Sequence, residues 1–177
     1  EVQKALLRFL DSKGEIIAVD IFDMRLKTVE ENFKRLGITN IKTLSFDART
    51  LAIEPGDRVL VDAPCSGFGT LSKKPDIKWK QDPAQLEKLG QLQYEIIVNA
   101  SRHVKPDGVL VYSTCTIEPE ENSEIVEKFL ASHTNFVLES ADKFVLPDVV
   151  SEKGYIETYP HIHHIDGSFS ARLKRIF

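Results

Sequence analysis

The chain has little cysteine, no long apolar run and no excess of basic residues. Two cysteines in 177 residues do not make a disulfide framework, so we expect reduced thiols and a cytoplasmic protein. No apolar run approaches the ~20 residues of a membrane helix, and no secretory signal opens the chain, so we expect no membrane partner. The 23 lysines and arginines do not outnumber the 27 aspartates and glutamates, and the net charge of −4 means that any nucleic-acid contact must be local.

A glycine-rich loop for phosphate or nucleotide is absent after every strand that we expect. The first expected strand, 15–20, ends in Asp20. This ending is typical of the second strand of a nucleotide-binding half, in which an acid bonds the ribose hydroxyls. We therefore expect the first strand and its glycine loop to lie upstream of Glu1.

Short apolar runs alternate with helical patterns along the chain. The runs predict strands at 15–20, 41–46, 58–62, 108–113, 135–139 and 168–177. The helical patterns predict the end of a helix at 1–10, helices at 23–36 and 82–104 (with Asp82 as N-cap), a helix that starts at Pro119, a turn at 105–108 and irregular structure over 140–167. This alternation predicts an α/β fold with a mostly parallel sheet and helices on both faces.

The two cysteines follow two of these apolar runs. Cys65 ends Val-Leu-Val-Asp-Ala-Pro-Cys, and Cys115 ends Val-Leu-Val-Tyr-Ser-Thr-Cys. Such continuous β-branched runs are typical of parallel strands buried on both faces, and ligands bind at the carboxyl ends of those strands. The plainer interpretation is two buried thiols that act as small hydrophobes.

Three acids, Asp20, Asp47 and Asp62, lie at or just past the end of an expected strand. A single aspartate there is most often a helix cap or a turn former. Three of them along one sheet edge can accept hydrogen bonds from ribose hydroxyls, an adenine amino group and an ammonium, which are the polar groups of S-adenosylmethionine.

A basic segment follows the first cysteine. Lys73, Lys74, Lys78 and Lys80 stand against a single acid, and Trp79, the only tryptophan, lies among them. This composition suits phosphate contacts and stacking on an unpaired base. A solvated loop with the tryptophan packed inward as an anchor is an equally good interpretation.

The three histidines near the C-terminus, His161, His163 and His164, match no zinc-binding pattern with nearby cysteines. We expect no metal site, and we interpret these histidines as loop or RNA-facing residues.

Four segments together resemble the RNA cytosine-5 methyltransferases of the NOL1/NOP2/Sun family. They are Asp-Ala-Pro-Cys-Ser-Gly, Lys-Pro-Asp-Ile-Lys-Trp, Tyr-Ser-Thr-Cys-Thr-Ile-Glu-Pro-Glu-Glu-Asn and the closing Asp-Gly-Ser-Phe-Ser-Ala-Arg-Leu. In the last segment Ser168 replaces the phenylalanine that the family usually has. The resemblance runs from about Ile16 to the C-terminus, and it is greatest to the bacterial Sun/Fmu type, which modifies 16S ribosomal RNA.

This resemblance implies a Rossmann-like class I methyltransferase fold. Residues 1–177 would form an S-adenosylmethionine-dependent catalytic domain that is truncated at its N-terminus. The family's glycine-rich methionine-binding loop, and the upstream RNA-binding helical domain of the Sun/Fmu type, are both missing. The implied partner is RNA with an unpaired or flipped cytosine, and we expect a monomer.

The resemblance also implies a role for each motif residue. Cys115 corresponds to the nucleophile, and Cys65 to the cysteine that assists product release. Asp62 lies close to the target base. Further residues would bind the cofactor or the RNA: Asp20, Arg25, Asp47 and Asp62 the cofactor, and Lys73, Lys74, Lys78, Trp79 and Lys80 the RNA.

The chemistry explains the need for a thiol. Addition of a thiolate to C6 of cytosine turns C5 into an enamine-like nucleophile, which is covalent catalysis. The site should therefore lower the pKa of Cys115 below the ~8.5 of a free cysteine. A helix N-terminus at Pro119 would help this, whereas Glu118, Glu120 and Glu121 would oppose it.

Three alternatives stay open at this point. A DNA cytosine methyltransferase would use the Pro-Cys thiol as its nucleophile, and a tRNA rather than a ribosomal RNA is a second substrate. A non-catalytic RNA-binding or ribosome-assembly module with a decayed methyltransferase fold is the third. The missing glycine loop favours this last alternative, and the presence of both cysteines and all three acids argues against it.

Overall fold

The structure is a computed structural model that describes residues 14–80 and 83–177. The chain divides into two compact units, Glu1–Leu51 and Ala52–Phe177, and each unit is described by itself. The helix expected at 1–10 and the N-cap expected at Asp82 lie outside the described residues.

The described part of the first unit contains two parallel strands and a helix. β1 (Ile16–Asp20) pairs with β2 (Ile41–Ser45), and α2 (Asp23–Arg35) connects them. Leu26 and Phe33 lie on one face of α2 and are buried, as the apolar periodicity predicts. The helix ends before Gly37, whose φ of 72° lies in the left-handed region that favours glycine.

The sheet of the second unit is mixed, so the prediction of a mostly parallel sheet was wrong. β3 (Gly56–Asp62), β4 (Val104–Thr114), β7 (Ser168–Arg175) and β5 (Phe136–Leu138) follow one another in space, and β6 (Ile156–Thr158) also pairs with β7. β3 and β4 are parallel, whereas β7 is antiparallel to β4, β5 and β6. A parallel neighbour needs a long crossover, and only residues 159–167 separate β6 from β7.

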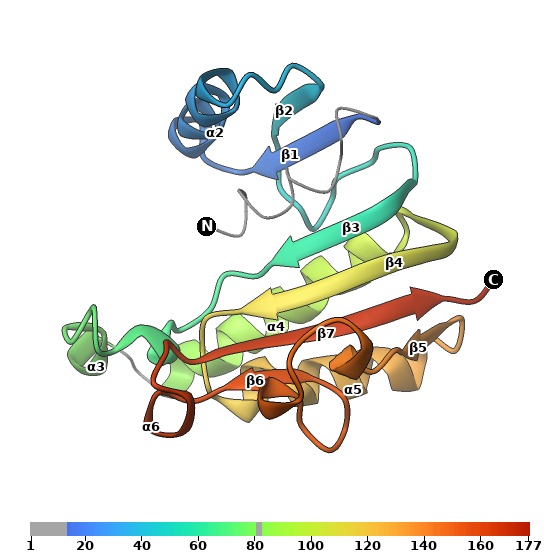
Figure 1. Cartoon of the computed structure of the whole chain (residues 1–177). Helices are drawn as coiled ribbons and strands as arrows, with labels where there is room; N and C mark the ends of the chain where they lie inside the picture. Colours follow the sequence, from blue (N-terminus) through green and yellow to red (C-terminus); the bar gives the residue numbers. More distant parts are fainter. Residues whose placement is uncertain (1–13, 81–82) are drawn as a thin grey trace. The chain divides into compact units, whose positions relative to one another are not determined.

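Two helices cover one side of this sheet. Figure 1 shows both α4 (Pro83–Ser101) and α5 (Ser123–Ser132) on that side, rather than on opposite faces. Ile97 on α4 and Phe129 on α5 pack against Leu110 and Tyr112 of β4, and all four side chains are fully buried. The other face of β3 is more open, since Leu60 is 39% exposed. The expectation that this strand is buried on both faces was therefore wrong.

The turn expected at 105–108 lies within β4 as a bulge. The pairing of β3 with β4 passes from Gly56 opposite Val104 to Arg58 opposite Val109, so the intervening residues of β4 leave the ladder. Asp107 takes a φ of 61° there.

The segment 140–167, expected to be irregular, contains β6 and several short helices. These are η3 (Ala141–Lys143), η4 (Pro147–Val149) and α6 (Pro160–His163), while η1 (Phe68–Thr70), α3 (Ile77–Lys80) and η2 (Pro119–Glu121) lie earlier in the chain. Elements of three or four residues are too short to show a hydrophobic period, so sequence patterns do not reveal them. Within residues 14–80 and 83–177, no helix combines the length and the hydropathy of a membrane span.

Candidate active site

The two cysteines come together where β3 and β4 end. These strands are parallel neighbours, with Asp62 opposite Ser113, and each thiol follows its strand within three residues. The Sγ atoms of Cys65 and Cys115 are 3.3 Å apart, and the backbone N–H of Cys115 donates to Cys65 Sγ at 3.3 Å. Both thiols are free; Cys65 is half-buried and Cys115 is exposed. The interpretation as two buried structural thiols therefore does not fit Cys115.

The contact between the thiols changes their ionisation. The hydrogen bond with Cys65 lowers the pKa of Cys115 to about 7, although partial burial and the charge of Asp62 oppose this. The same hydrogen bond, together with burial, raises the pKa of Cys65. Either sulfur can donate in this hydrogen bond, and the two shifts favour ionisation of Cys115 over Cys65. The expected lowering of the pKa of Cys115 is confirmed, but its main cause is the second thiol and not a helix N-terminus at Pro119.

Two charged residues act on this thiol pair, Asp62 from the end of β3 and Lys74 from the segment after η1. Burial raises the pKa of Asp62, so its carboxyl lies in a partly desolvated place beside the thiols. The positive charge of Lys74 helps to lower the pKa of Cys115. The sequence predicted Asp62 near the target base and Lys74 as an RNA contact; the structure places the charges of both close enough to act on Cys115.

Two glycines hold the turn after β3 against the start of β7. The N–H of Gly69 donates to the carbonyl of Cys115 at 3.1 Å, and the N–H of Gly167 donates to the carbonyl of Gly69 at 2.8 Å. A Cβ on Gly69 would lie 2.0 Å from the carbonyl oxygen of Gly167, so a side chain cannot be accommodated without a shift of backbone. The carbonyl of Cys115 is therefore held by the turn at Gly69, which is itself held by the start of β7 through Gly167.

A fully buried network lies behind the thiols, and sequence reasoning missed it. At its centre is Glu121, which binds Ser66 through both carboxyl oxygens; Ser66 also bonds Thr116. From α4, Gln93 donates to Glu121 at 2.9 Å and to the carbonyl of Pro64 at 2.8 Å. The available signal was the repeated order of a cysteine followed by a hydroxyl residue, Cys-Ser and Cys-Thr, together with the Glu-Glu-Asn that closes the second motif.

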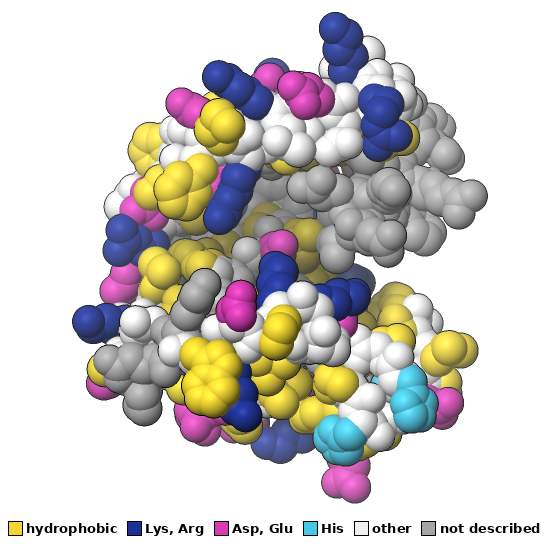
Figure 2. Space-filling view, turned by 90° about the vertical axis from the view of Figure 1, so that its left-hand side faces the viewer, with side chains coloured by type: hydrophobic (Ala, Val, Ile, Leu, Met, Phe, Trp, Pro, Cys, Tyr) yellow, Lys and Arg dark blue, Asp and Glu magenta, His cyan; other side chains and the backbone are white. Residues whose placement is uncertain are grey.

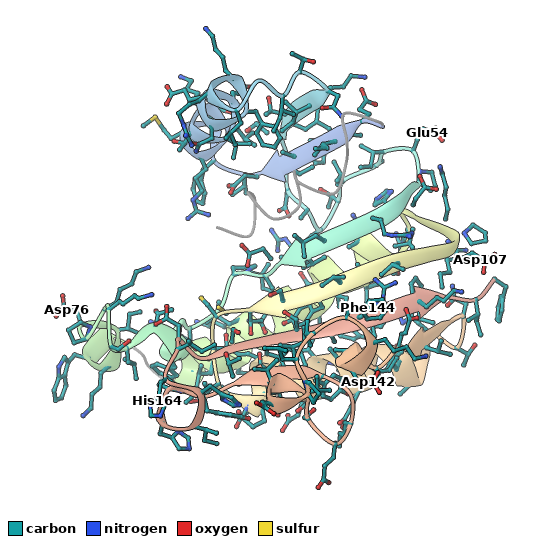
Figure 3. The ribbon with its side chains drawn as sticks, in the orientation of Figure 1. Glu54, Asp76, Asp107, Asp142, Phe144 and His164 are labelled. Atoms are coloured by element: carbon teal, nitrogen blue, oxygen red, sulfur yellow. The ribbon has the colours of Figure 1, made fainter. Side chains whose placement is uncertain are left out.

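An open hollow of about 740 Å³ reaches Cys115. Its walls come from the segment after η1 and from the loop between α6 and β7, and they include Lys73, His164 and Asp166. Figure 3 shows His164 at α6 and Asp76 beside α3, at the end of the sheet where β3 and β4 terminate. Figure 2 views the molecule from that end and shows basic, hydrophobic and histidine side chains on the face turned to the reader. A flat ligand that enters this hollow can reach the thiol of Cys115.

The basic segment lies along the same end of the sheet. Lys73 forms an ion pair with Asp166 at 2.5 Å, which ties the segment to the loop before β7. Trp79 is 81% exposed, with the ammonium of Lys78 over its ring at 5.3 Å, so it is not the inward-packed anchor of the plainer interpretation. The side chain of Lys80 lies outside the described residues.

The three histidines separate into different roles. Both ring nitrogens of His163 are used, one accepting from the N–H of Tyr159 and the other bonding the carbonyl of Asp148, each at 2.9 Å. The ring of His161 lies beside that of Tyr159. His164 has a φ of 56° and lines the hollow. His163 is thus a structural residue, and His164 is the histidine placed near Cys115.

The remaining predicted acids lie in the first unit. Asp20 ends β1, accepts from the N–H of Phe22 at 2.9 Å, and pairs with Arg25 at 3.4 Å. Asp47, just past β2, is bonded by Arg49 through both of its carboxyl oxygens, and these contacts lower the pKa of Asp47. The structure therefore brings Asp20, Arg25 and Asp47 to the adjacent ends of β1 and β2.

Comparison with known proteins gives a consistent family. A family model described as 16S rRNA methyltransferase RsmB/F matches residues 4–174. The ribosomal RNA small subunit methyltransferase B of Enterobacter sp. (strain 638) is 39% identical over 165 residues, covering 91% of this chain and 37% of that protein. The methyltransferase F of Aliivibrio fischeri (strain MJ11) is 33% identical over 177 residues, covering 94% and 36%. The chain thus spans well under half the length of these relatives.

A solved structure has the same α/β fold. The crystal structure of NSun6 from Pyrococcus horikoshii with SFG matches with a TM-score of 0.85 and 34% identity, over 98% of this chain and 44% of that one. The family expected from the motifs and the α/β class are both confirmed.

Proposed function

The chain belongs to the 16S rRNA methyltransferase RsmB/F family, and from this we propose that it transfers a methyl group from S-adenosylmethionine to C5 of a cytosine in 16S ribosomal RNA. Within that activity we assign to the chain the role of the catalytic domain. The single observation that carries the proposal is the approach of two thiols to 3.3 Å at the ends of two parallel strands. An exposed thiol with a lowered pKa beside a protonated one suits attack followed by release.

In the proposed reaction the Cys115 thiolate adds to C6 of the cytosine, and the electron pair of the C5–C6 double bond becomes available at C5. C5 would then bond the methyl carbon while the carbon–sulfur bond of the sulfonium breaks, with its electron pair staying on the sulfur of S-adenosylhomocysteine, which leaves. In the release step the C5 proton passes to a water molecule in the open hollow, the electron pair of the C5–H bond restores the double bond, and the Cys115–C6 bond breaks to return the thiolate. Cys65 assists this step from its position beside the sulfur that departs.

Asp62 would hold the base. Its carboxyl lies beside the thiols, and its raised pKa indicates a partly desolvated site. A hydrogen bond with the amino and N3 edge of cytosine would place C6 over Cys115. The base must leave any helical stack to enter the hollow, which implies an unpaired or flipped nucleotide.

S-adenosylmethionine would supply an electrophilic methyl group on its sulfonium centre. The acids of the first unit have the chemistry for its polar groups, because Asp20 and Asp47 are only partly buried and accept hydrogen bonds at the ends of adjacent strands. Arg25 already pairs with Asp20 and would orient that carboxylate. The similarity to NSun6, which was solved with the S-adenosylmethionine analogue SFG, supports this assignment.

The basic segment would bind the RNA strand next to the target cytosine. Lys73, Lys74 and Lys78 would contact phosphates, and the exposed ring of Trp79 offers a face for an unpaired base. Lys80 would join them. Because these contacts would be made by lysine ammonium groups to phosphates, their contribution to RNA affinity should fall as the salt concentration rises.

The test is methyl transfer by the full-length protein to 16S ribosomal RNA, with a tRNA and a DNA oligonucleotide as competing substrates. Cys115→Ala should reduce the rate by a factor of roughly 10³ or more, as loss of a covalent nucleophile does. Cys65→Ala should form the adduct and release it slowly. Transfer by the Cys115→Ala variant near the wild-type rate, or no transfer by any form, would overturn the proposal.

A further inference from the structure

Behind the two thiols lies a carboxyl group that has no contact with solvent. Glu121 is 0% exposed. Its Oε1 accepts from the N–H of Ser66 and from the side-chain amide of Gln93, each at 2.9 Å, and its Oε2 accepts from the hydroxyl of Ser66 at 2.5 Å. Because the donors are uncharged groups, the cost of burying this carboxyl is offset by directed hydrogen bonds and not by a cation.

The residue bound by Glu121 is the neighbour of Cys65. Ser66 has one hydroxyl proton, which it donates to Glu121, so the hydroxyl of Thr116 must donate to Ser66 Oγ across 2.8 Å. Thr116 is the neighbour of Cys115. The residues that directly follow the two thiols are therefore bonded to each other, and one of them, Ser66, is held by the carboxyl of Glu121.

Glu121 also fixes the strand that delivers Cys115. Its backbone carbonyl accepts from the hydroxyl of Tyr112 on β4 at 2.7 Å, and the next residue, Asn122, bonds Thr114 and the carbonyl of Thr116. The hydrogen bonds of Glu121 and Asn122 thus reach the chain next to Cys65 and the chain on both sides of Cys115.

Gln93 shows that the arrangement is kept at a cost. Its amide donates to Glu121 and to the carbonyl of Pro64, the residue before Cys65. Its own Oε1 is buried and has no hydrogen-bond partner among the described residues. A side chain that leaves an acceptor unpaired in the interior is retained for its donors.

We propose that Glu121 is a positioning residue for the two-thiol reaction: with Gln93, it holds the Cys65 turn against the Cys115 turn, so that the two sulfur atoms stay at hydrogen-bonding distance. Its side chain bonds Ser66 and Gln93 and neither sulfur, so it acts through its neighbours. The use of this geometry in cytosine methylation rests on the proposed function, whereas the geometry itself does not.

A positioning role and a purely electrostatic role predict opposite results. Loss of a negative charge near Cys115 would by itself lower the pKa of that thiol. Loss of the hydrogen bonds from Glu121 would let Cys65 move away from Cys115. The pKa of Cys115, now about 7, would then rise, because the hydrogen bond with Cys65 is the main cause of its lowering. A general loss of packing would lower the thermal stability without a defined change in this pKa.

The experiment measures alkylation of Cys115 by iodoacetamide as a function of pH, in the full-length protein, with the modified residue identified by mass spectrometry. Glu121→Ala should move the midpoint upward and slow alkylation at pH 7 about fivefold or more, since the thiolate fraction falls. Glu121→Gln keeps an acceptor for Ser66 and Gln93 and should restore the rate to within about twofold. Glu120→Ala is the matched control, because Glu120 is the exposed neighbour on the same turn.

An alkylation profile of Glu121→Ala that equals that of Glu120→Ala would overturn the proposal, as would a Gln variant as slow as the Ala variant. Where circular dichroism shows that Glu121→Ala is unfolded, Gln93→Met decides: it should slow alkylation at least twofold, and an unchanged rate refutes the proposal. The measurement uses neither RNA nor a methyl donor. Its failure is therefore distinguishable from failure of the proposed function.

Discussion

In the first unit, Asp20 and Asp47 lie in partial contact with solvent, and each is bonded by an arginine from the same stretch of chain, Arg25 or Arg49. In the second unit, the carboxyl of Glu121 binds Gln93 and Ser66, which are 28 and 55 positions away, and it is wholly buried. Acids that meet a diffusing ligand must stay accessible and need only local support. Thiols that react in sequence need a fixed separation, and only distant parts of the chain can impose it.

The largest expected difference between the two regions is in stability. Glu121→Ala removes the buried acceptor of the Ser66 N–H and hydroxyl and one of the two acceptors of the Gln93 amide, and it should lower the free energy of unfolding by roughly 2–5 kcal/mol. Asp47→Ala, in the first unit, removes a solvent-screened ion pair, and we expect a much smaller loss. Urea unfolding measures both. Equal losses would show that burial does not distinguish the two regions.

The close approach of two glycines gives a second contrast, within the second unit. Gly69→Ala forces a Cβ against the carbonyl of Gly167 and should cost about 1–3 kcal/mol. Gly56→Ala is the matched control, since its Cβ would meet only the carbonyl oxygen of Arg58 at 3.7 Å. Thermal unfolding of the two variants checks this. A Gly69→Ala protein as stable as Gly56→Ala would contradict the packing described around Cys115.

The pH dependence of Cys115 alkylation should respond to a substitution in the second unit and not to one in the first unit. The thiolate fraction rises as pH passes the pKa, which the hydrogen bond with Cys65 holds at about 7. Cys65→Ala removes that hydrogen bond, so the alkylation midpoint should rise toward the ~8.5 of a free cysteine. Arg25→Ala, in the first unit, should leave the midpoint in place. A midpoint that stays near pH 7 without Cys65 would assign the lowered pKa to another cause.

The smallest expected effect is the stability change of Arg25→Ala itself. Its guanidinium is 69% exposed, and such pairs contribute at most about 1 kcal/mol. We expect the free energy of unfolding to stay within about 0.5 kcal/mol of the wild type, while calorimetry shows weaker binding of S-adenosylmethionine. A large loss of stability would mean that this pair supports the fold instead of a ligand.

Much of the fold follows from the sequence. The bounds of β1, β2, α2 and α4 agree with the hydrophobic periods and the caps to within a few residues. The direction of β7 does not, because an apolar alternation shows which side chains are buried and not which neighbour the strand pairs with. The short elements between 140 and 167 form through contacts with the sheet, so their own sequence lacks a period.

The candidate site likewise contains residues that the sequence predicts and one that it does not. Cys65, Cys115 and Asp62 were predictable, because they directly follow strong strand patterns and belong to recognisable motifs. Glu121 was not, since a glutamate at the start of a helix is most often a solvated residue that favours the positive helix end. Its burial depends on Ser66 and Gln93, which are 55 and 28 residues away. The sequence marks these long-range hydrogen bonds only by the hydroxyl residue after each cysteine and by the Glu-Glu-Asn of the second motif.

The most direct test of the account is a covalent complex between the protein and RNA. The full-length Cys65→Ala variant, incubated with 16S ribosomal RNA and S-adenosylmethionine, should accumulate an adduct that survives denaturing electrophoresis and maps to Cys115. The Cys65→Ala/Cys115→Ala double variant should give none. An adduct that maps to another residue, or an adduct that persists in the double variant, would contradict the assignment of Cys115 as the nucleophile and Cys65 as the thiol that assists release.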